Sequence, residues 1–207
     1  METSGGMGVA GEMVTPRSSL GLSAIWACAN LISGTLSSLP FELTLKSAGE
    51  VAKTATDHPL HSVIYESPNF DQTALDFWDF MNLSLELWGN AYASVVRDKQ
   101  RIVALYPVQP DAMTVRRLTD GRLEYQWTDG GKSYTRLDRD VLHIRGPGGN
   151  PLGGMSTLSH GVQAFSSALA AERAAASMFE NGLRPSALIA FKEWLSPHRA
   201  RCGRKNH

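Results

Sequence analysis

The sequence has few cysteines and no excess of charge of either sign. Of its 207 residues only Cys28 and Cys202 are cysteines, and 20 Lys and Arg balance 20 Asp and Glu. Two cysteines cannot build a disulfide framework or, alone, a zinc site. We expect Cys28 to be a small buried residue and Cys202 an incidental tail thiol. The neutral total also lacks the basic excess of a protein that reads nucleic-acid sequence, although such a chain can still surround nucleic acid.

Long apolar runs are missing as well. No stretch approaches the roughly 20 residues that a membrane-spanning helix needs. The Gly-rich N-terminus lacks the basic start and apolar block of a secretory signal. We therefore expect no membrane partner, and a location in the cytoplasm or in an assembly that forms there.

Motifs of catalysis and cofactor binding are also missing. The loop GPGGNPLGG (146–154) follows an apolar strand and precedes a helix, but no Lys follows it and neither GxGxxG nor GxSxG occurs. We expect this loop to be a flexible connector. The other candidate groups show no pairing for metal or acid–base chemistry: His58, His61, Glu124, Asp138, Asp140 and His143. The sequence therefore predicts no catalytic residue, no cofactor and no metal. A hydrolase that uses the 146–154 loop with Ser156 or His143 is the weakest alternative.

The chain is divided into three parts: a flexible leader over 1–18, an α+β domain over 19–190 and a basic tail over 191–207. Within the domain, a helix capped by Ser18 or Ser19 runs to Pro40, with an apolar face formed by Leu22, Ile25, Trp26, Ala29, Ile32 and Leu36. FELTLK (41–46) alternates as a half-buried strand, and a loop or ragged hairpin follows.

Two further helices and a corner come next. Asp57 is a fair N-cap for a short helix with Pro59 in its first turn. Thr73 and Asp76 fit a capping box for a helix that is apolar over more than half its circumference. In LWGNAYASVVRD (87–98) Gly89 can take the left-handed conformation that ends a helix, and Asn90 tolerates it. The sequence predicts a tight helix-to-strand corner there.

Alternating segments separated by turn residues then predict a β-meander of six antiparallel strands packed on helices. The strands are expected at 91–97, 101–106, 113–118, 122–127, 133–136 and 141–145. A long Ala-rich helix, capped by Ser156 or Thr157, runs to about 181 and is closed by Gly182; 184–191 is a candidate last strand. The fold class is therefore α+β.

Basic residues gather in the tail and near several strand ends. They either contact nucleic-acid phosphates or keep exposed segments solvated, and the sequence leaves both readings open: Arg97, Lys99, Arg101, Arg116, Arg117, Lys192, Arg199, Arg201, Arg204 and Lys205.

An ordered series of segments resembles one known family. The chain from about 20 to about 195 is similar to the portal proteins of tailed bacteriophages, HK97-like family. The resemblance rests on SAIWACANLISGTLSSLPFEL (23–43), DHPLHSVIYESPN (57–69), FWDFMNLSLELWGNAYASVVRD (77–98), VALYPVQPDAMTV (103–115), DVLHIRG (140–146) and FENGLRPSAL (179–188).

The resemblance implies a structural, non-enzymatic protein. Such portals form a homo-oligomeric ring of about twelve subunits at one capsid vertex, and ring closure requires a head-to-tail interface between subunits. A terminase motor, the capsid and a tail connector are the implied partners, and double-stranded DNA passes through the channel without sequence specificity. The implied location is the virion, with assembly in the host cytoplasm.

The family's stem, clip, tunnel loop and crown should come largely after residue 190. Residues 191–207, which end in RARCGRKNH, are therefore expected to be either the truncated start of the stem region or an unrelated basic tail. The nucleic-acid-contacting residues are therefore unknown. One hypothesis is a truncated portal from a decayed prophage or a shifted reading frame. The alternative is a small α+β module that binds a ligand or partner and is unrelated to phage.

Overall fold

The structure is a computed structural model that describes residues 5–45 and 53–182. The chain forms two compact units, residues 1–170 and 171–207. Within the described part no helix is both long enough and apolar enough to cross a membrane. In chain order the elements are β1 (Gly6–Met7), β2 (Met13–Val14), α1 (Pro16–Leu20), α2 (Ser23–Ser37), β3 (Thr44–Leu45), β4 (Lys53–Thr54), α3 (Pro59–Tyr65), α4 (Ala74–Trp88), β5 (Asn90–Asp98), β6 (Arg101–Val108), η1 (Pro110–Ala112), β7 (Thr114–Arg117), β8 (Leu123–Asp129), β9 (Lys132–Leu137), η2 (Asp138–Asp140), β10 (Val141–Arg145), α5 (Thr157–His160) and α6 (Val162–Glu180).

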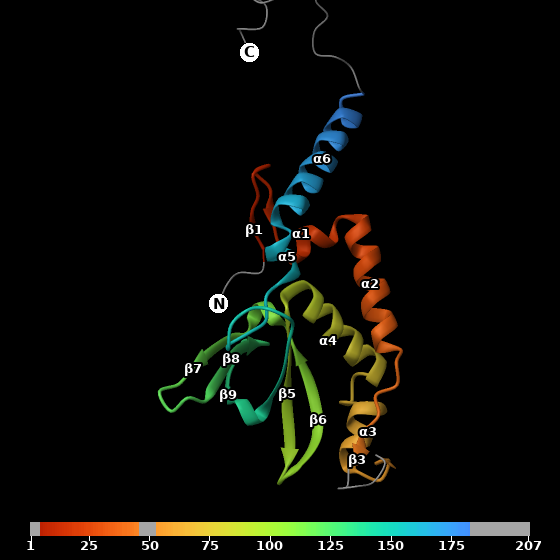
Figure 1. The fold of residues 1–207 in the computed structure, drawn as a ribbon, viewed down its shortest axis with the longest axis vertical. Helices are drawn as coiled ribbons and strands as arrows, with labels where there is room; N and C mark the ends of the chain where they lie inside the picture. Colours follow the sequence, from red (N-terminus) through yellow and green to blue (C-terminus); the bar gives the residue numbers. More distant parts are fainter. Residues whose placement is uncertain (1–4, 46–52, 183–207) are drawn as a thin grey trace, which may run out of the picture. The chain divides into compact units, whose positions relative to one another are not determined.

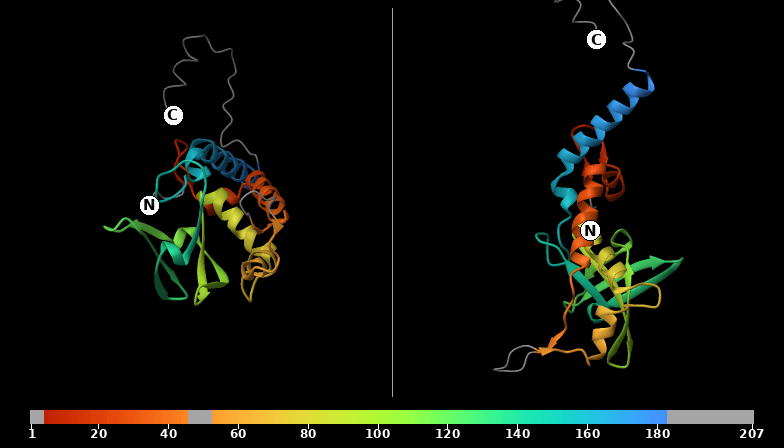
Figure 2. Two further views of the ribbon diagram at one scale, coloured as in Figure 1. Left: turned by 60° about the horizontal axis from the view of Figure 1, so that its bottom comes forward. Right: turned by 90° about the vertical axis from the view of Figure 1, so that its right-hand side faces the viewer.

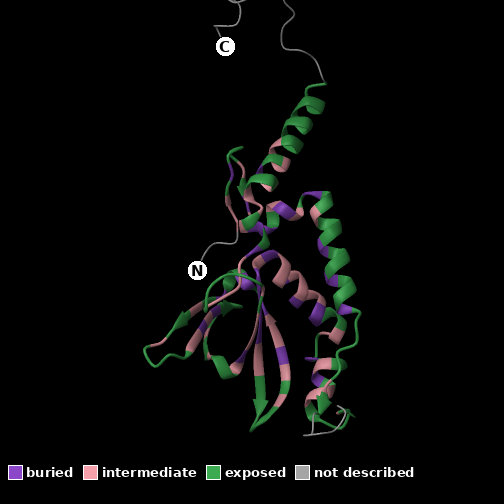
Figure 3. Ribbon diagram, in the orientation of Figure 1, coloured by how far each residue is buried: buried purple, intermediate pink, exposed green. Residues whose placement is uncertain are grey.

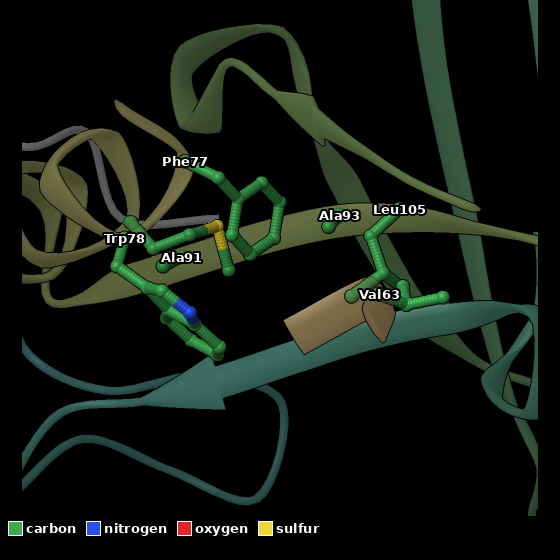
Figure 4. Close-up of a cluster of buried hydrophobic side chains, with 7 residues drawn as sticks. Val63, Phe77, Trp78, Ala91, Ala93 and Leu105 are labelled. Atoms are coloured by element: carbon green, nitrogen blue, oxygen red, sulfur yellow. The ribbon is translucent and has the colours of Figure 1, made fainter. Parts of the chain in front are cut away.

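Helix α4 is the centre of the first unit. It begins at the predicted capping box, in which the Asp76 N–H donates to Thr73 Oγ1 and the Thr73 N–H donates to Asp76 Oδ2. It lies between α2 and the sheet that contains β5 (Figures 1 and 2). In Figure 4 side chains from α3, α4, β5 and β6 converge on one core: Val63, Phe77, Trp78, Met81, Ala91, Ala93 and Leu105. The predicted burial of this helix on most sides is confirmed.

All six predicted strands of the antiparallel region are present, and the α+β class is confirmed. Their pairing differs from a simple meander. They form two three-stranded sheets, β10-β5-β6 and β7-β8-β9, because β6 is not paired with β7 and β10 pairs with β5 rather than with β9. A second apolar cluster joins side chains from both sheets: Tyr92, Val108, Met113, Tyr125, Trp127 and Val141.

The prediction of a flexible leader is wrong for residues 5–18. They form the β1–β2 hairpin and the start of α1, whose cap is Thr15 in a capping box with Ser18. Val14 is completely buried against Leu87 and Leu158, which explains why this segment is ordered. The rest of the three-part division stays a prediction.

The apolar face predicted for α2 is only partly correct. Leu22 and Ala29 are buried, but Trp26, Ile32 and Leu36 are 52%, 48% and 44% exposed. The buried positions in the middle and at the end of the helix are the small residues Ser33 and Ser37. Cys28, expected to be buried, is exposed.

Smaller corrections follow from local hydrogen bonds. The cap of α3 is His58 rather than Asp57, because its Nδ1 accepts from the Leu60 N–H at 3.1 Å. The strand expected over 41–46 shortens to β3, paired with β4, and Leu45 is 67% exposed. The helix expected from 157 to 181 is interrupted at Gly161, so α5 and α6 are separate.

In the second unit the described residues are the end of α6 and the turn that follows. Residues 171–182 are all exposed (Figure 3), and Gly182 has the left-handed φ of 66° expected at a helix end. The strand expected at 184–191 and the basic tail over 191–207, with Cys202, lie outside the described residues.

Candidate functional site

The corner between α4 and β5 is a tightly constrained part of the backbone of the first unit. Gly89 has φ 69° and ψ 6°, and its N–H donates to the Leu85 carbonyl at 2.9 Å. A Cβ at this position would overlap the Met155 carbonyl oxygen. Glycine is therefore required by backbone conformation and by close approach. The predicted helix-to-strand corner is confirmed.

Asn90 is the first residue of β5 and fastens the Gly-rich loop to this corner. Its Nδ2 donates to the Trp88 carbonyl at 3.1 Å and to the Gly154 carbonyl at 3.0 Å, while its Oδ1 accepts from the Gly154 N–H at 2.8 Å. Ser156 adds a hydrogen bond from its Oγ to the Leu87 carbonyl at 2.7 Å. The loop is therefore fixed against the corner, which corrects the expectation of a flexible connector.

The hydrogen bonds of this loop also argue against phosphate binding. A phosphate cradle needs backbone N–H groups that point at the ligand. Most amides of the loop and of the residue after it donate inside the protein instead: those of Gly146, Asn150, Leu152, Gly153, Gly154 and Met155. The amides of the loop are therefore used to fix the loop against the α4–β5 corner.

His143 connects the two sheets beside the corner. Its Nε2 lies 3.0 Å from Asn90 Oδ1, and its Nδ1 lies 3.1 Å from the Tyr125 hydroxyl. Because the Asn90 oxygen can only accept, Nε2 carries the proton and Nδ1 accepts from Tyr125. Burial, with a smaller contribution from Arg145, lowers the pKa of His143 to about 4. The ring is thus a neutral structural link between the two sheets.

A cleft of about 750 Å³ opens next to the corner, between the α1 start, the α4 end and the Gly-rich loop. Its lining includes the rings of Trp88 and Tyr92, with Arg17 and Asp111 as the charged groups. No histidine, cysteine or lysine occurs among the described residues that line it. Its chemistry suits packing against an apolar or aromatic group better than acid–base or metal work.

The other candidate residues are not brought together. Ser156 is committed to Leu87 and His143 to Asn90 and Tyr125, so they do not form a nucleophile–base pair. His61 stacks on Tyr65 with ring centroids 5.1 Å apart. Within residues 5–45 and 53–182 no group of three His, Cys, Asp or Glu side chains could hold a metal ion.

Several acidic and basic residues in and next to the strands form ion pairs with one another. Glu124 pairs with Arg116, and Asp140 lies 3.8 Å from Arg97 and 3.3 Å from Arg139. Because at least one partner of each pair is open to solvent, such pairs contribute little stability, up to about 1 kcal/mol each. Because Arg97 and Arg116 each have a carboxylate neighbour, their positive charges are partly neutralised within the chain, which argues against a phosphate-binding role for this pair of residues.

Comparison with known proteins agrees with the fold. The family model for phage portal proteins matches residues 23–205. The portal protein of Enterobacteria phage HK97 is 27% identical over 176 residues, which are 84% of this chain and 41% of that protein. The probable portal protein of Streptomyces phage phiC31 is 30% identical over 200 residues, 89% of this chain and 42% of its own length.

A solved structure shares the fold of this chain. A chain in the neck of a native gene transfer agent particle, computed with C12 symmetry, has a TM-score of 0.63 at 19% identity and covers 97% of this chain and 56% of its own. This chain spans about two fifths of the length of the curated relatives it matches. Because the family match covers most of the sequence, and the resemblance to HK97-like portals is confirmed by the HK97 protein itself, the chain belongs to the phage portal protein family.

Proposed function

We propose that this protein is a phage portal subunit, a structural ring component at the capsid vertex through which double-stranded DNA is packaged and ejected. The observation that carries the proposal is the family match over residues 23–205, on a chain that also has the matching α+β fold. In this proposal residues 19–190 form the wing-like domain, the outer α/β region of a portal subunit, and residues 191–207 are the start of the stem region, which is supported by a family match that extends to residue 205. The location is the virion, after assembly in the host cytoplasm.

The proposed partners are further copies of the chain, the capsid, a terminase motor and a tail connector. The C12 symmetry of the gene transfer agent neck supports a ring of about twelve, because a head-to-tail interface closes when its rotation divides a full turn. DNA passes without sequence recognition. The balance of 20 basic and 20 acidic residues suits this, because strong phosphate pairing would hold the DNA in place.

The proposal includes no enzymatic activity. Ser156 and His143 have separate partners, and the corner cleft has no histidine or cysteine among its described lining residues. The polar groups around the corner hold backbone in place, so their role is to stabilise the fold.

The native mass of the purified chain tests the proposal, measured by light scattering on a sizing column at low and moderate salt, with electron microscopy of the same fractions. We expect a closed ring of about twelve subunits. A chain that stays monomeric at every concentration would contradict the ring role. The family membership, which rests on the sequence, would still stand.

A further inference from the structure

Helix α2 lies in a long charge-free part of the described chain, and a second such part runs between Arg145 and Glu172. No Asp, Glu, Lys or Arg occurs between Arg17 and Glu42. A helix that faces water normally carries charged residues on its outer side. Figure 3 nevertheless shows α2 exposed along most of its length. The sequence of α2 is therefore that of a buried helix, although little of it is buried within this chain.

The packing of α2 within the chain uses its small residues. It packs on α4, and its buried residues are Ala29, Ser33 and Ser37, which are 6%, 1% and 6% exposed. Asn82 of α4 faces α2 at its C-terminal end, where Asn82 Nδ2 donates a hydrogen bond to Ser37 Oγ at 3.2 Å. The internal contact thus leaves the large apolar side chains of α2 outside.

Those side chains form one continuous strip, which we call the α2 flank. Cys28, Leu31, Ile32 and Leu36 follow one another at steps of three, one and four, so they share neighbouring turns of one side of the helix, and Leu39 continues the strip after the helix end. Leu31, Ile32, Leu36 and Leu39 are 71%, 48%, 44% and 55% exposed. Contiguous apolar surface of this kind marks an interaction site.

We propose that the α2 flank is one half of the subunit interface and that a neighbouring copy of this chain covers it. The inference rests on the proposed portal function. A surface without charge does not attract nucleic acid, and it has the composition of the buried centre of a protein–protein interface. In a ring each subunit offers two different surfaces to its two neighbours, and the C12 neck contains a chain of this fold. The α2 flank supplies one of these surfaces and packs against another element of the next subunit.

A double variant with a matched control tests this directly. Leu31→Glu/Ile32→Glu places two charges on the flank at positions already exposed, so the monomer should keep its thermal unfolding midpoint. The control Val9→Glu changes an apolar residue that is 91% exposed in the β1–β2 turn. At the concentration at which wild type and control form rings, the double variant should be monomeric, with half-assembly shifted at least about tenfold.

The exposed Cys28 gives a second readout without any change on the flank. In a Cys202→Ser background, a maleimide should label Cys28 at least about tenfold more slowly in the ring than in the monomer, because the neighbour covers it. A photocrosslinker attached to Cys28 should then join α2 of one copy to a different element of the next.

The outcomes separate the two proposals. A ring that forms normally with Leu31→Glu/Ile32→Glu, or that labels at Cys28 as fast as the monomer, overturns the flank interface and leaves the portal function standing. Crosslinks from α2 to α2 indicate a twofold dimer and overturn the head-to-tail interface. A wild-type chain that never assembles overturns the ring itself.

Discussion

His143 is kept neutral by its position between Asn90 and Tyr125. In the unfolded chain a histidine titrates near pH 6.5, whereas in the folded protein its pKa is about 4. Above about pH 6.5 the ring is neutral in both states and its contribution to stability is fully present. Between about pH 6.5 and 4 the unfolded state binds the proton first, so the free energy of unfolding falls as the pH falls.

Urea unfolding between pH 4.5 and 7.5 checks this. The difference in unfolding free energy between wild type and His143→Gln should shrink steadily as the pH is lowered, because only wild type loses the contribution of the neutral imidazole. His160→Gln, at an exposed position, serves as the control and should keep the wild-type slope. A pH-independent difference at His143 would show that the ring is not the source of the slope.

Gly89 is the residue on which the corner depends. In Gly89→Ala the left-handed conformation alone should cost about 1 to 2 kcal/mol. The added Cβ also meets the Met155 carbonyl oxygen, so the total should be larger. Gly130→Ala is the matched control, because Gly130 has φ 54° but open space around the Cβ position. Equal losses of unfolding free energy in the two variants would mean that the contact with Met155 yields easily.

At the scale of the elements, local sequence patterns predicted the helix ends and strands correctly where these depend on residues close together in the sequence. The alternation over 91–145 located every strand, and Thr73–Asp76 and Gly89 located both ends of α4, because capping and alternation depend on neighbours in sequence. The pairing of β10 with β5 was not accessible in this way. It depends on residues about 50 positions apart, such as His143 and Tyr92, and no local signal specifies it.

In α2 the apolar periodicity did not predict which face of the helix is buried within the chain, and the reason is physical. Its largest apolar side chains predicted the inward face, but the residues of the helix that are buried are Ala29, Ser33 and Ser37. A hydrophobic pattern indicates which side avoids water and does not say whether the cover comes from the same chain. A local pattern also could not predict the role of Asn90, because its partners in the 146–154 loop are more than 60 residues away in the sequence.

The polar side of α4 leads to a prediction about Glu86. Burial, reinforced by the nearby carboxylate of Asp79, raises the pKa of Glu86 to about 7. Its Oε1 has no hydrogen-bond partner among the described residues. Folding therefore takes up a proton between about pH 4.5 and 7, and stability falls as the pH rises through this window.

Glu86→Gln removes the charge and keeps the shape. We expect the variant to unfold at a higher temperature than wild type at pH 8, with the gain disappearing near pH 4.5, where the carboxyl is protonated in both states. Glu66→Gln, at the exposed end of α3, should show no such pH-dependent gain. A loss of stability at pH 8 would indicate that the Glu86 carboxylate has a favourable partner in solution.

At the scale of the whole molecule, the distribution of charge separates two kinds of surface. Charged residues are dense around the strand turns, where Asp98, Lys99 and Arg101 stand close together, and absent between Arg17 and Glu42. A ring held through the α2 flank therefore depends on removal of apolar surface from water rather than on ion pairs.

This difference predicts how assembly responds to solution conditions. Exposed ion pairs are screened when salt rises from about 0.1 M to about 1 M, because the Debye length falls to roughly 3 Å. An apolar contact keeps its strength under the same change and weakens on cooling. The ring measured by light scattering should thus keep its mass in about 1 M NaCl and dissociate more readily at low temperature than at 25 °C. Dissociation by salt alone would point instead to charged turns such as Asp98–Arg101 as the contact between subunits.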